Sequence, residues 1–329
     1  MKRFGLMLLS ALWLASPCPQ AAAQTAFPNK PVKIIVPYAA GGATDVVARI
    51  LGEQLRQIFG QAFVVENKPG ASGILAIEEM ARSKPDGHTL MIGNVSTMGI
   101  TPVLLTKKMT IDFGKDVRIV ARVADYPVFL TVTTTDFPPK TVAEFVAYAK
   151  IRPGQIRYSS AGIGSIQQFD SAALSKQAGL DLVHIPAKAG GAQMLRDLAT
   201  GDTHVSWLNI GTPVPFIKAG QMRPLAIVGD KRHPEWPDVP TMAESGFPGI
   251  GSVQWQALYA PAGVPADIVA ALHKAIGQAL EAPAVKEAYK KSGIVAPARQ
   301  TIEEAAAWQR KEIAHWKQMA VELKIEAEE

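Results

Sequence analysis

VKIIVPYAAGGATD, at residues 32–45 of a 329-residue chain, joins three local patterns. Val32 to Val36 is a largely β-branched run, typical of a strand that is buried on both faces. Gly41 and Gly42 allow the backbone to turn tightly and expose its amides. From Asp45 to Phe59, apolar side chains recur at helical spacing. A strand that turns through glycines into an amphipathic helix is the first unit of a parallel sheet covered by helices.

This alternation of strands and helices continues along the chain. Further strands are predicted at Phe63–Val65, Thr89–Ile92, Phe129–Thr133, Arg157–Ser160, Leu182–Ile185, His204–Leu208 and Leu225–Val228. Helices are predicted at Asp45–Phe59, Ile74–Ala81, Ser165–Gln177, Ala192–Ala199, Pro265–Leu280, Pro283–Lys291 and Ile302–Leu323, with another that opens at Thr141. Thr141 with Glu144, and Thr301 with Glu304, have the spacing of capping boxes.

Two such α/β units predict two lobes, each a mixed or parallel sheet flanked by helices. We expect the chain to cross between them twice, near Ala124–Phe129 and near Val228–Pro234, so that two strands form a hinge. The first lobe then comprises residues 24–124 plus 235–329, and the second comprises residues 125–234. The long C-terminal helices have no sheet of their own, and we expect them to cover the first lobe.

The N-terminus has the layout of a secretory signal peptide. Lys2 and Arg3 precede an apolar stretch from Phe4 to Ala15, and Ala21-Ala22-Ala23 offers a cleavage site. That apolar stretch is shorter than the ~20 residues that span a bilayer. We therefore predict residues 1–23 to be a signal peptide, cleaved after about Ala23, and a periplasmic mature protein without membrane insertion.

Composition excludes several classes of function. Cleavage would remove the sole cysteine, Cys18, so the mature chain would form no disulfide and bind no metal through sulfur. The six histidines are scattered without metal-ligand spacing, and no run of basic residues indicates nucleic-acid binding. No serine-hydrolase or zinc-protease motif is present. We predict no metal, no cofactor and no catalytic residue.

The turn Pro37–Asp45 predicts an anion site, because the free amides and positive dipole at a helix start favour negative charge. Thr44 or Asp45 is the expected N-cap. The stretch Ser159–Ser165 repeats this design in the second lobe, and two such helix starts would face each other across a cleft. The alternative for each is a plain strand–helix turn without a ligand.

Two more loops follow predicted strands, and for each a plain turn and a ligand contact are equally good interpretations. These are Gly93–Thr97 and Pro186–Gly191. Lys188 in the latter could attract a carboxylate, although a lone lysine is more often solvated surface. The predicted ligand-binding residues are Tyr38, Ala39, Ala40, Gly41, Gly42, Thr44, Asp45, Ser96, Thr97, Ser160, Gly162, Gly164, Ser165, Gln168 and Ala187.

Several motifs resemble, in order along nearly the whole mature chain, those of the Bug proteins, the substrate-binding receptors of tripartite tricarboxylate transporters. They are Ile35–Gly42 with Asp45 and Ala48-Arg49, Val65–Gly73, Pro85-Asp86-Gly87, Ser160–Ser165, Ile217–Gly220, Pro237–Gly246 and Ala260–Pro265. The resemblance implies a two-lobed, type II-like periplasmic binding fold that closes on a ligand like a Venus flytrap. It also implies that the loops Tyr38–Asp45 and Ser160–Ser165 hold a ligand carboxylate through backbone amides, hydroxyls and bridging waters.

This chain departs from the family pattern at several positions. Gln168 stands where the family often has His, and Ala187 where it often has Tyr; Ala189 replaces a glycine. His204 and Leu208 stand where acidic residues are common. If the Ala187 side chain points inward, the missing ring would enlarge the cleft. We therefore expect the far end of the ligand to be bulkier or less charged than a small dicarboxylate.

The resulting expectation is a monomeric receptor that captures a small organic carboxylate and delivers it to membrane transporter subunits. One alternative is a sensor that presents the bound acid to a signalling protein. A more distant alternative is a periplasmic hydrolase or isomerase that uses Asp45 as a base.

Overall fold

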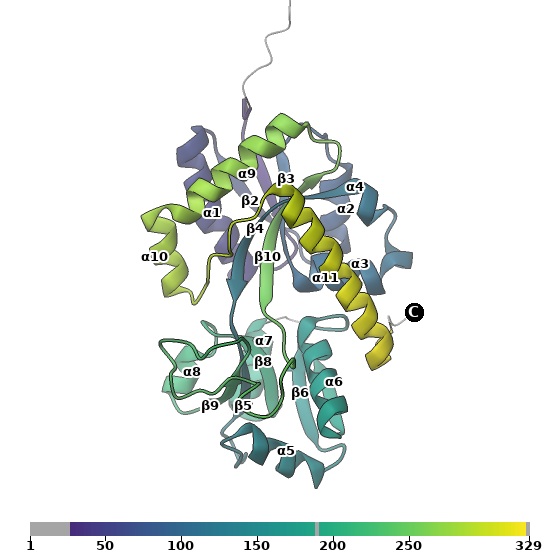
Figure 1. Ribbon diagram of the computed structural model, residues 1–329, viewed down its shortest axis with the longest axis vertical. Helices are drawn as coiled ribbons and strands as arrows, with labels where there is room; N and C mark the ends of the chain where they lie inside the picture. The colour runs from purple at the N-terminus through teal and green to yellow at the C-terminus, as the bar shows by residue number, and fades with distance from the viewer. Residues whose placement is uncertain (1–26, 188–190, 327–329) are drawn as a thin grey trace, which may run out of the picture.

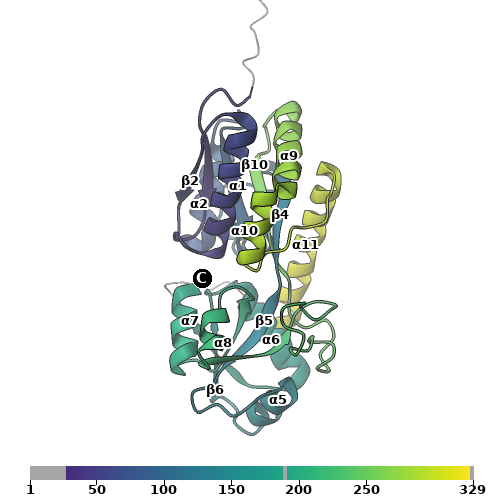
Figure 2. The same cartoon turned by 90° about the vertical axis from the view of Figure 1, so that its left-hand side faces the viewer.

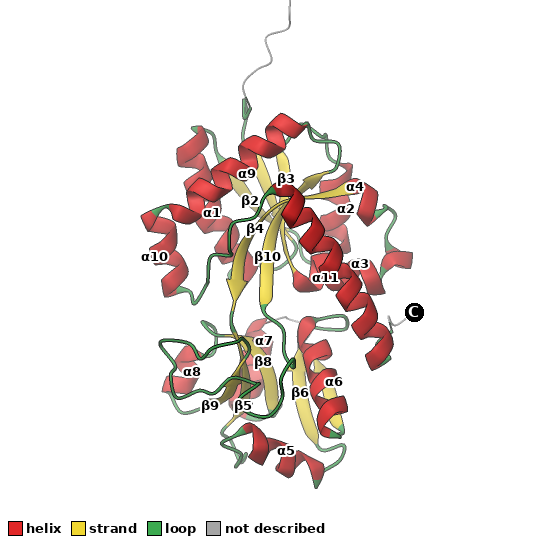
Figure 3. Cartoon of the chain, viewed as in Figure 1, coloured by secondary structure: helices red, strands yellow, loops and turns green. Residues whose placement is uncertain are grey.

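The computed structural model describes residues 27–187 and 191–326, and Figure 1 shows them as two lobes, one above the other. Each lobe is built on a five-stranded mixed sheet with helices packed against it, as Figure 3 shows by secondary structure. The predicted α/β, two-lobed fold class is confirmed. The predicted signal peptide, residues 1–23, and Lys188 and Ala189 lie outside the described residues.

The first sheet has the strand order β2-β1-β3-β10-β4. Its strands are β1 (Val32–Val36), β2 (Phe63–Asn67), β3 (Thr89–Asn94), β4 (Val117–Tyr126) and β10 (Gln254–Pro261). β1 pairs in parallel with both β2 and β3, whereas β10 runs antiparallel to β3 and β4. The carboxyl ends of β1, β2 and β3 therefore meet at one edge.

Helices cover both faces of this sheet. Successive strand residues point to opposite sides, so the apolar residues of β1 need a helical layer on each side. Ile34 of β1 packs in the core beneath α1 (Ala43–Phe59), α9 (Ala266–Glu281) and α10 (Pro283–Lys291). Its neighbour Ile35 packs in the other core, beneath α2 (Ile74–Arg82) and α11 (Ile302–Leu323). Figure 2 shows α1 and α9 side by side on one flank of the lobe. The C-terminal helices thus return to the first lobe as expected.

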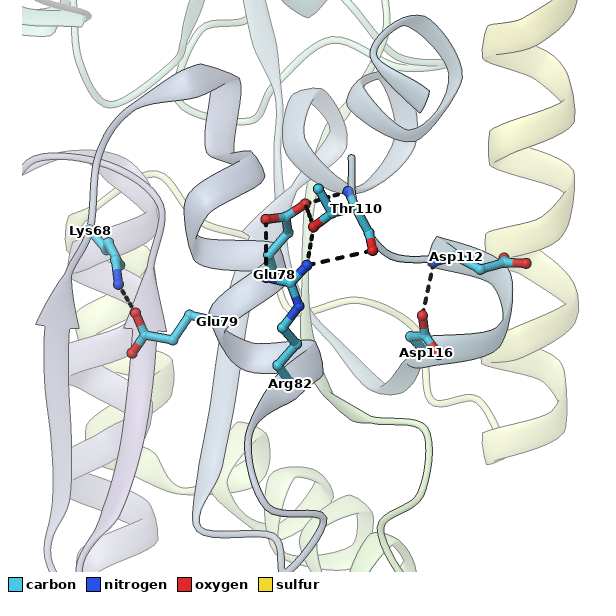
Figure 4. Close-up of polar contacts among 7 residues, drawn as sticks. All are labelled: Lys68, Glu78, Glu79, Arg82, Thr110, Asp112 and Asp116. Atoms are coloured by element: carbon cyan, nitrogen blue, oxygen red, sulfur yellow. Dashed lines mark hydrogen bonds and ion pairs between the residues drawn. The ribbon is translucent and has the colours of Figure 1, made fainter. Parts of the chain in front are cut away.

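Polar contacts fix α2 against the segments beside it (Figure 4). Glu79 pairs with Lys68, which follows β2, and with Lys33 of β1. Glu78 accepts a hydrogen bond from the Thr110 hydroxyl at 2.7 Å. Beyond Thr110, the Asp116 carboxylate of α4 (Phe113–Asp116) accepts from the Asp112 amide at 2.8 Å. The two lysines that pair with Glu79 are partly exposed, so each of these ion pairs contributes little free energy.

The second sheet has the order β7-β6-β8-β5-β9. Its strands are β5 (Val128–Thr133), β6 (Ile156–Ser160), β7 (Leu182–Pro186), β8 (Val205–Asn209) and β9 (Met222–Ile227). Its helices are α5 (Val142–Lys150), α6 (Ile166–Ala178), α7 (Gly191–Thr200) and α8 (Val214–Lys218). β6 is parallel to β7 and β8, and β5 is antiparallel to β8 and β9.

The chain crosses between the sheets at Pro127, where β4 ends and β5 begins, as expected. The return crossing was expected near Val228–Pro234, but it comes later in the chain. The Met242 amide donates to the Ile227 carbonyl at 2.9 Å, and Phe247 packs against the hydrophobic core of the second lobe. The segment after β9 thus stays on the second lobe until Ser252, just before β10 pairs with β4. The strands β4 and β10 were not predicted, because their partners are far away in sequence.

The two expected capping boxes differ. At Thr301 both reciprocal hydrogen bonds of the box are present. At Thr141 the hydroxyl accepts from the Glu144 amide at 3.1 Å, but the Glu144 carboxylate accepts from the Lys140 amide instead. The second box is therefore only half formed, since Glu144 reaches one residue further back along the chain.

Candidate functional site

The carboxyl ends of β1, β2 and β3 bring three loops together. The Tyr38 hydroxyl, just after β1, donates to Asn94 Oδ1 at the end of β3, at 2.7 Å. The Asn67 amide group, at the end of β2, donates to the Tyr38 carbonyl at 3.0 Å. Thr97 is buried and its amide donates to Asn94 Oδ1 at 3.2 Å. Tyr38 and Thr97 therefore belong to one hydrogen-bonded edge of the sheet.

The start of α1 leaves amides free at this edge. Gly42 is the N-cap, in extended conformation, and no side chain caps the helix. The Val46 amide is the first to bond within the helix, to the Gly42 carbonyl at 3.0 Å. Within the described part of the chain, the amides of residues 43–45 have no acceptor. Residues 39–42 are exposed. Thr44 and Asp45 are thus not the N-cap: both lie inside the helix and are buried.

Asp45 organises the turn from beneath. Its side chain is only 4% exposed. The carboxylate accepts three hydrogen bonds, each at 2.9 Å, from the Gly41 amide, Arg49 Nε and Asn67 Nδ2. Burial raises the pKa of Asp45, but the bonds from Arg49, Gly41 and Asn67, with the charge of Arg49, outweigh burial and hold this pKa below its ordinary value.

Arg49 and Asn67 were not among the predicted site residues. The signals for them were present: Arg49 lies four residues after Asp45, on the same helix face. Asn67 ends the strand that neighbours β1 in the parallel sheet. Together they hold Asp45, and Asp45 holds the Gly41 turn.

In the second loop, Ser160–Gln168, both glycine amides have acceptors within the loop. Ser160 is fully buried, and its hydroxyl accepts from the Gly162 amide at 3.1 Å and pairs with His184 Nε2 at 2.5 Å. The Gln168 side-chain carbonyl accepts from the Gly164 amide at 2.8 Å. Ser165 is the N-cap of α6, but its hydroxyl donates back to the Gly162 carbonyl at 2.6 Å. The glycine amides here are therefore occupied, unlike those at the start of α1.

Ser96 connects the two lobes at this place. Its hydroxyl, in a π-helical turn at Ser96–Ile100, accepts from the Ile166 amide at 3.2 Å. Ile166 opens α6 of the second lobe. The missing side-chain cap of α6 is thus supplied by the first lobe, and Ser96 and Ser165 lie on neighbouring segments.

Ala187 faces away from an open surface. Its side chain is 2% exposed and packs with Met194, Leu198 and Leu208 of the second lobe. Its amide donates to the Ser160 carbonyl at 2.8 Å. The condition that this side chain points into a cleft is not met, so a larger cleft does not follow from Ala187. His204 stacks on Phe137, with ring centroids 5.3 Å apart, at the amino end of β8 and so at the opposite edge of the sheet.

Two cavities lie outside these loops. One, of about 590 Å³, lies between residues 233–235 of the second lobe and α10. The other, of about 330 Å³, lies at the return crossing, beside α6 and α11. Among the residues that the structure describes, no cluster of three or more His, Cys, Asp or Glu residues could hold a metal. Nor is any helix in that part of the chain long and apolar enough to cross a membrane.

Similar solved structures define the class of protein. A structure of the periplasmic binding protein BugD has a TM-score of 0.80 at 30% identity and covers 92% of this chain and 100% of its own. Rpa4515 of R. palustris, solved with adipate, has a TM-score of 0.84 at 31% identity, covering 91% and 99%. MatC of Rhodopseudomonas palustris, solved with bound malate, has a TM-score of 0.80 at 32% identity, covering 89% and 99%. The fold is that of periplasmic binding proteins.

The family follows from the sequence comparisons. Residues 47–325 match the model of the tripartite tricarboxylate transporter family receptor, TctC. A UPF0065 protein of Cupriavidus necator is 35% identical over 86% of this chain and 84% of its own length. Protein BugT of Bordetella pertussis is 31% identical over 88% of each. The chain therefore belongs to the TctC family of tripartite tricarboxylate transporter receptors, as its resemblance to the Bug proteins predicted.

Proposed function

We propose that this protein is a periplasmic receptor that captures a small organic acid between its lobes and delivers it to a tripartite tricarboxylate-type membrane transporter. The ligand carboxylate would bind at the exposed turn of residues 39–42 and the free amides at the start of α1. The second loop, with Ser160, Gly162, Gly164, Ser165 and Gln168, would close on the acid from the other lobe through side chains and bridging waters.

The observation that carries the proposal is the uncapped start of α1. A helix of this length has several unpaired amides at its N-terminus and a positive dipole end. At most helix starts a side chain of Ser, Thr, Asp or Asn takes up one of these amides. Here the cap is Gly42, and the nearby acid, Asp45, is turned beneath the loop. The amides are left for a ligand from solvent, and an anion is the group they favour.

The hydrogen bonding of Asp45 argues against catalysis. A general base needs a carboxylate that reaches the substrate and a pKa near the working pH. Asp45 is buried, accepts from three protein donors and has a lowered pKa. We therefore propose that binding is the whole of the chemistry of this protein and that Asp45 has a supporting role.

The relatives support a carboxylate as the ligand class. Adipate and malate are the acids in two of the solved structures. They differ in length but share carboxylate ends, which fits recognition by backbone amides at one end. We propose a mono- or dicarboxylate for this chain.

Calorimetric titration with a series of acids tests this proposal. We expect an acid such as adipate or malate to bind, and its amide or methyl ester to bind at least a hundredfold more weakly. A hundredfold loss corresponds to about 2.7 kcal/mol. Equal binding of acid and ester would overturn the carboxylate assignment. Native mass spectrometry of the freshly purified protein would show which acid is retained.

Transport and sensing use the same closed state, so a separate experiment distinguishes them. We propose transport, with residues 1–23 removed on export and the mature chain working as a monomer. Pull-down with membrane proteins, with and without the ligand, should recover transporter subunits only with the ligand-bound receptor. Recovery of a signalling protein instead would favour the sensor.

A further inference from the structure

Three consecutive residues of α6 contact three different parts of the molecule. Phe169 is fully buried against Trp316 of α11, with ring centroids 5.4 Å apart. The Asp170 carboxylate accepts from the Ser252 hydroxyl at 2.8 Å and from its amide at 3.2 Å. Ser171 Oγ accepts from the Trp207 indole of β8 at 3.1 Å. Successive helix residues point about 100° apart, so one turn can serve all three.

The two ends of α6 are also held by the first lobe. The Ile166 amide bonds to Ser96, and Lys176 Nζ donates to the Glu322 carbonyl of α11 at 3.1 Å. Yet Leu174 packs in the core of the second lobe. Helix α6 is therefore part of the second lobe by sheet packing and is anchored to the first lobe along its length. The lobes cannot separate at α6 without exposing Phe169.

Asp170 joins α6 to the return crossing itself. Ser252 precedes β10 by two residues, and Asp170 is 2% exposed. The carboxyl also lines the cavity of about 330 Å³, which Arg122 of β4 and Glu312 and His315 of α11 line as well. Burial raises the pKa of Asp170 to about 7, and the bonds from Ser252 lower it less. A hydroxyl can donate or accept, so Ser252 can pair with either form of the acid.

We propose that Asp170 is a positioning residue for ligand capture. By holding α6 on the crossing segment, it fixes the loop Ser160–Ser165, which leads directly into α6, relative to the loop Pro37–Asp45. The lobes then turn about α6 when the cleft opens. This proposal rests on the proposed function for its ligand-binding consequence, but the fixed joint is a property of the protein without a ligand.

Small-angle X-ray scattering of the ligand-free protein tests the joint. Asp170→Ala removes both bonds to Ser252, and we expect a larger radius of gyration and a broader distance distribution. Asp170→Asn keeps an acceptor for Ser252 and should scatter like the wild type. Ser171→Ala is the matched control, because it removes a bond to the second lobe from the next residue of the same helix. Scattering of Asp170→Ala identical to that of Ser171→Ala would overturn the proposal.

Binding of adipate, the probe acid, tests the consequence for capture. We expect Asp170→Ala to bind at least tenfold more weakly and Ser252→Ala about threefold more weakly, whereas Asp170→Asn should bind as tightly as the wild type. The effects of Asp170→Ala and Ser252→Ala should not add in the double variant. Circular dichroism shows whether each variant is folded. If Asp170→Ala does not fold, Ser252→Ala replaces it, and adipate binding by Ser252→Ala as tight as that of the wild type would overturn the proposal.

The two proposals can fail separately. If the wild type binds no acid, the proposed function is wrong, and scattering alone still judges the joint. If the wild type binds adipate and folded Asp170→Ala binds it equally well, Asp170 has no positioning role, whatever its effect on thermal stability.

Discussion

The turns after β1 and β6 have the same local design and opposite hydrogen bonding. Each runs from a buried strand through two glycines into a helix whose N-cap residue makes no side-chain capping hydrogen bond. In the first, the Gly41 amide is the one backbone amide that the Asp45 carboxylate accepts from, and the start of the following helix stays open. In the second, Ser160 and Gln168 take both glycine amides, and Ser96 takes the first helical amide.

This difference indicates that the two lobes have different tasks. An open helix start can bind a carboxylate directly, because its donors have no other partner. A loop whose glycine amides already have acceptors presents side chains instead. We infer that the first lobe anchors the acid and that the second completes the closed cleft. The expected sizes of the following mutational effects depend on that division.

The largest effect is expected for Gly41→Val. Gly41 has φ +83 and nothing within 4 Å of an added Cβ, so only the backbone opposes a β-branched residue. We expect adipate binding to weaken at least a hundredfold, because the turn must change shape. Gly162→Val is the matched control, at φ +119 and with equal space. It should lose less than tenfold, by calorimetry on variants with native circular dichroism. Equal losses would contradict the division between the lobes.

Asp45→Asn is expected to weaken adipate binding ten- to thirtyfold. The variant loses the charge that faces Arg49 and one strong acceptor of the Gly41 turn. Because the pKa of Asp45 is lower in the folded protein than its ordinary 3.8, the carboxylate stabilises the fold above pH 3.8. That contribution is lost as the pH falls through the folded pKa. Urea unfolding should therefore give the wild type a higher free energy of unfolding than the variant at pH 6. This difference should shrink as the pH falls below 4.

Ser96→Ala should weaken binding about fivefold. It removes the cap of α6 that crosses between the lobes, and a lost cap costs about 1 kcal/mol. Ser96→Thr keeps the hydroxyl and should restore most of the affinity. An affinity for Ser96→Ala that matches the wild type, measured at several temperatures, would show that this bond does not contribute to closure.

The smallest effect on binding is expected for Gln168→Ala. It frees the Gly164 amide without altering the first loop, and we expect less than a threefold change in adipate affinity. The free energy of unfolding should fall by about 1 kcal/mol, because a hydrogen bond within the loop is lost. A tenfold loss of affinity would instead make Gln168 a direct ligand contact and would narrow the difference between the loops.

Most of the fold was predictable from local pattern. The run of buried residues predicted the position of β1, and the apolar stripe predicted that of α1. The C-terminal helices from Pro265 onward were predicted in the same way. β4 and β10 were not predicted, because they are defined by pairing with each other across more than a hundred residues of sequence. Without β10, the residue at which the chain returns to the first lobe was also placed too early. The candidate site followed the same rule: its loops were predicted, but Arg49, Asn67 and the occupancy of the Gly162 and Gly164 amides were not.

The sequence by itself determined the strand–glycine–helix turns, the two α/β units and the family, because each depends on residues close together or on motifs in order. The tertiary structure decided which turn keeps its amides free. That outcome depends on where the side chains of Asp45, Ser160, Gln168 and Ser96 point, and Ser96 acts from the other lobe. Tertiary packing also made α6 the joint between the lobes, since Phe169, Asp170 and Ser171 find their partners only after both sheets have formed.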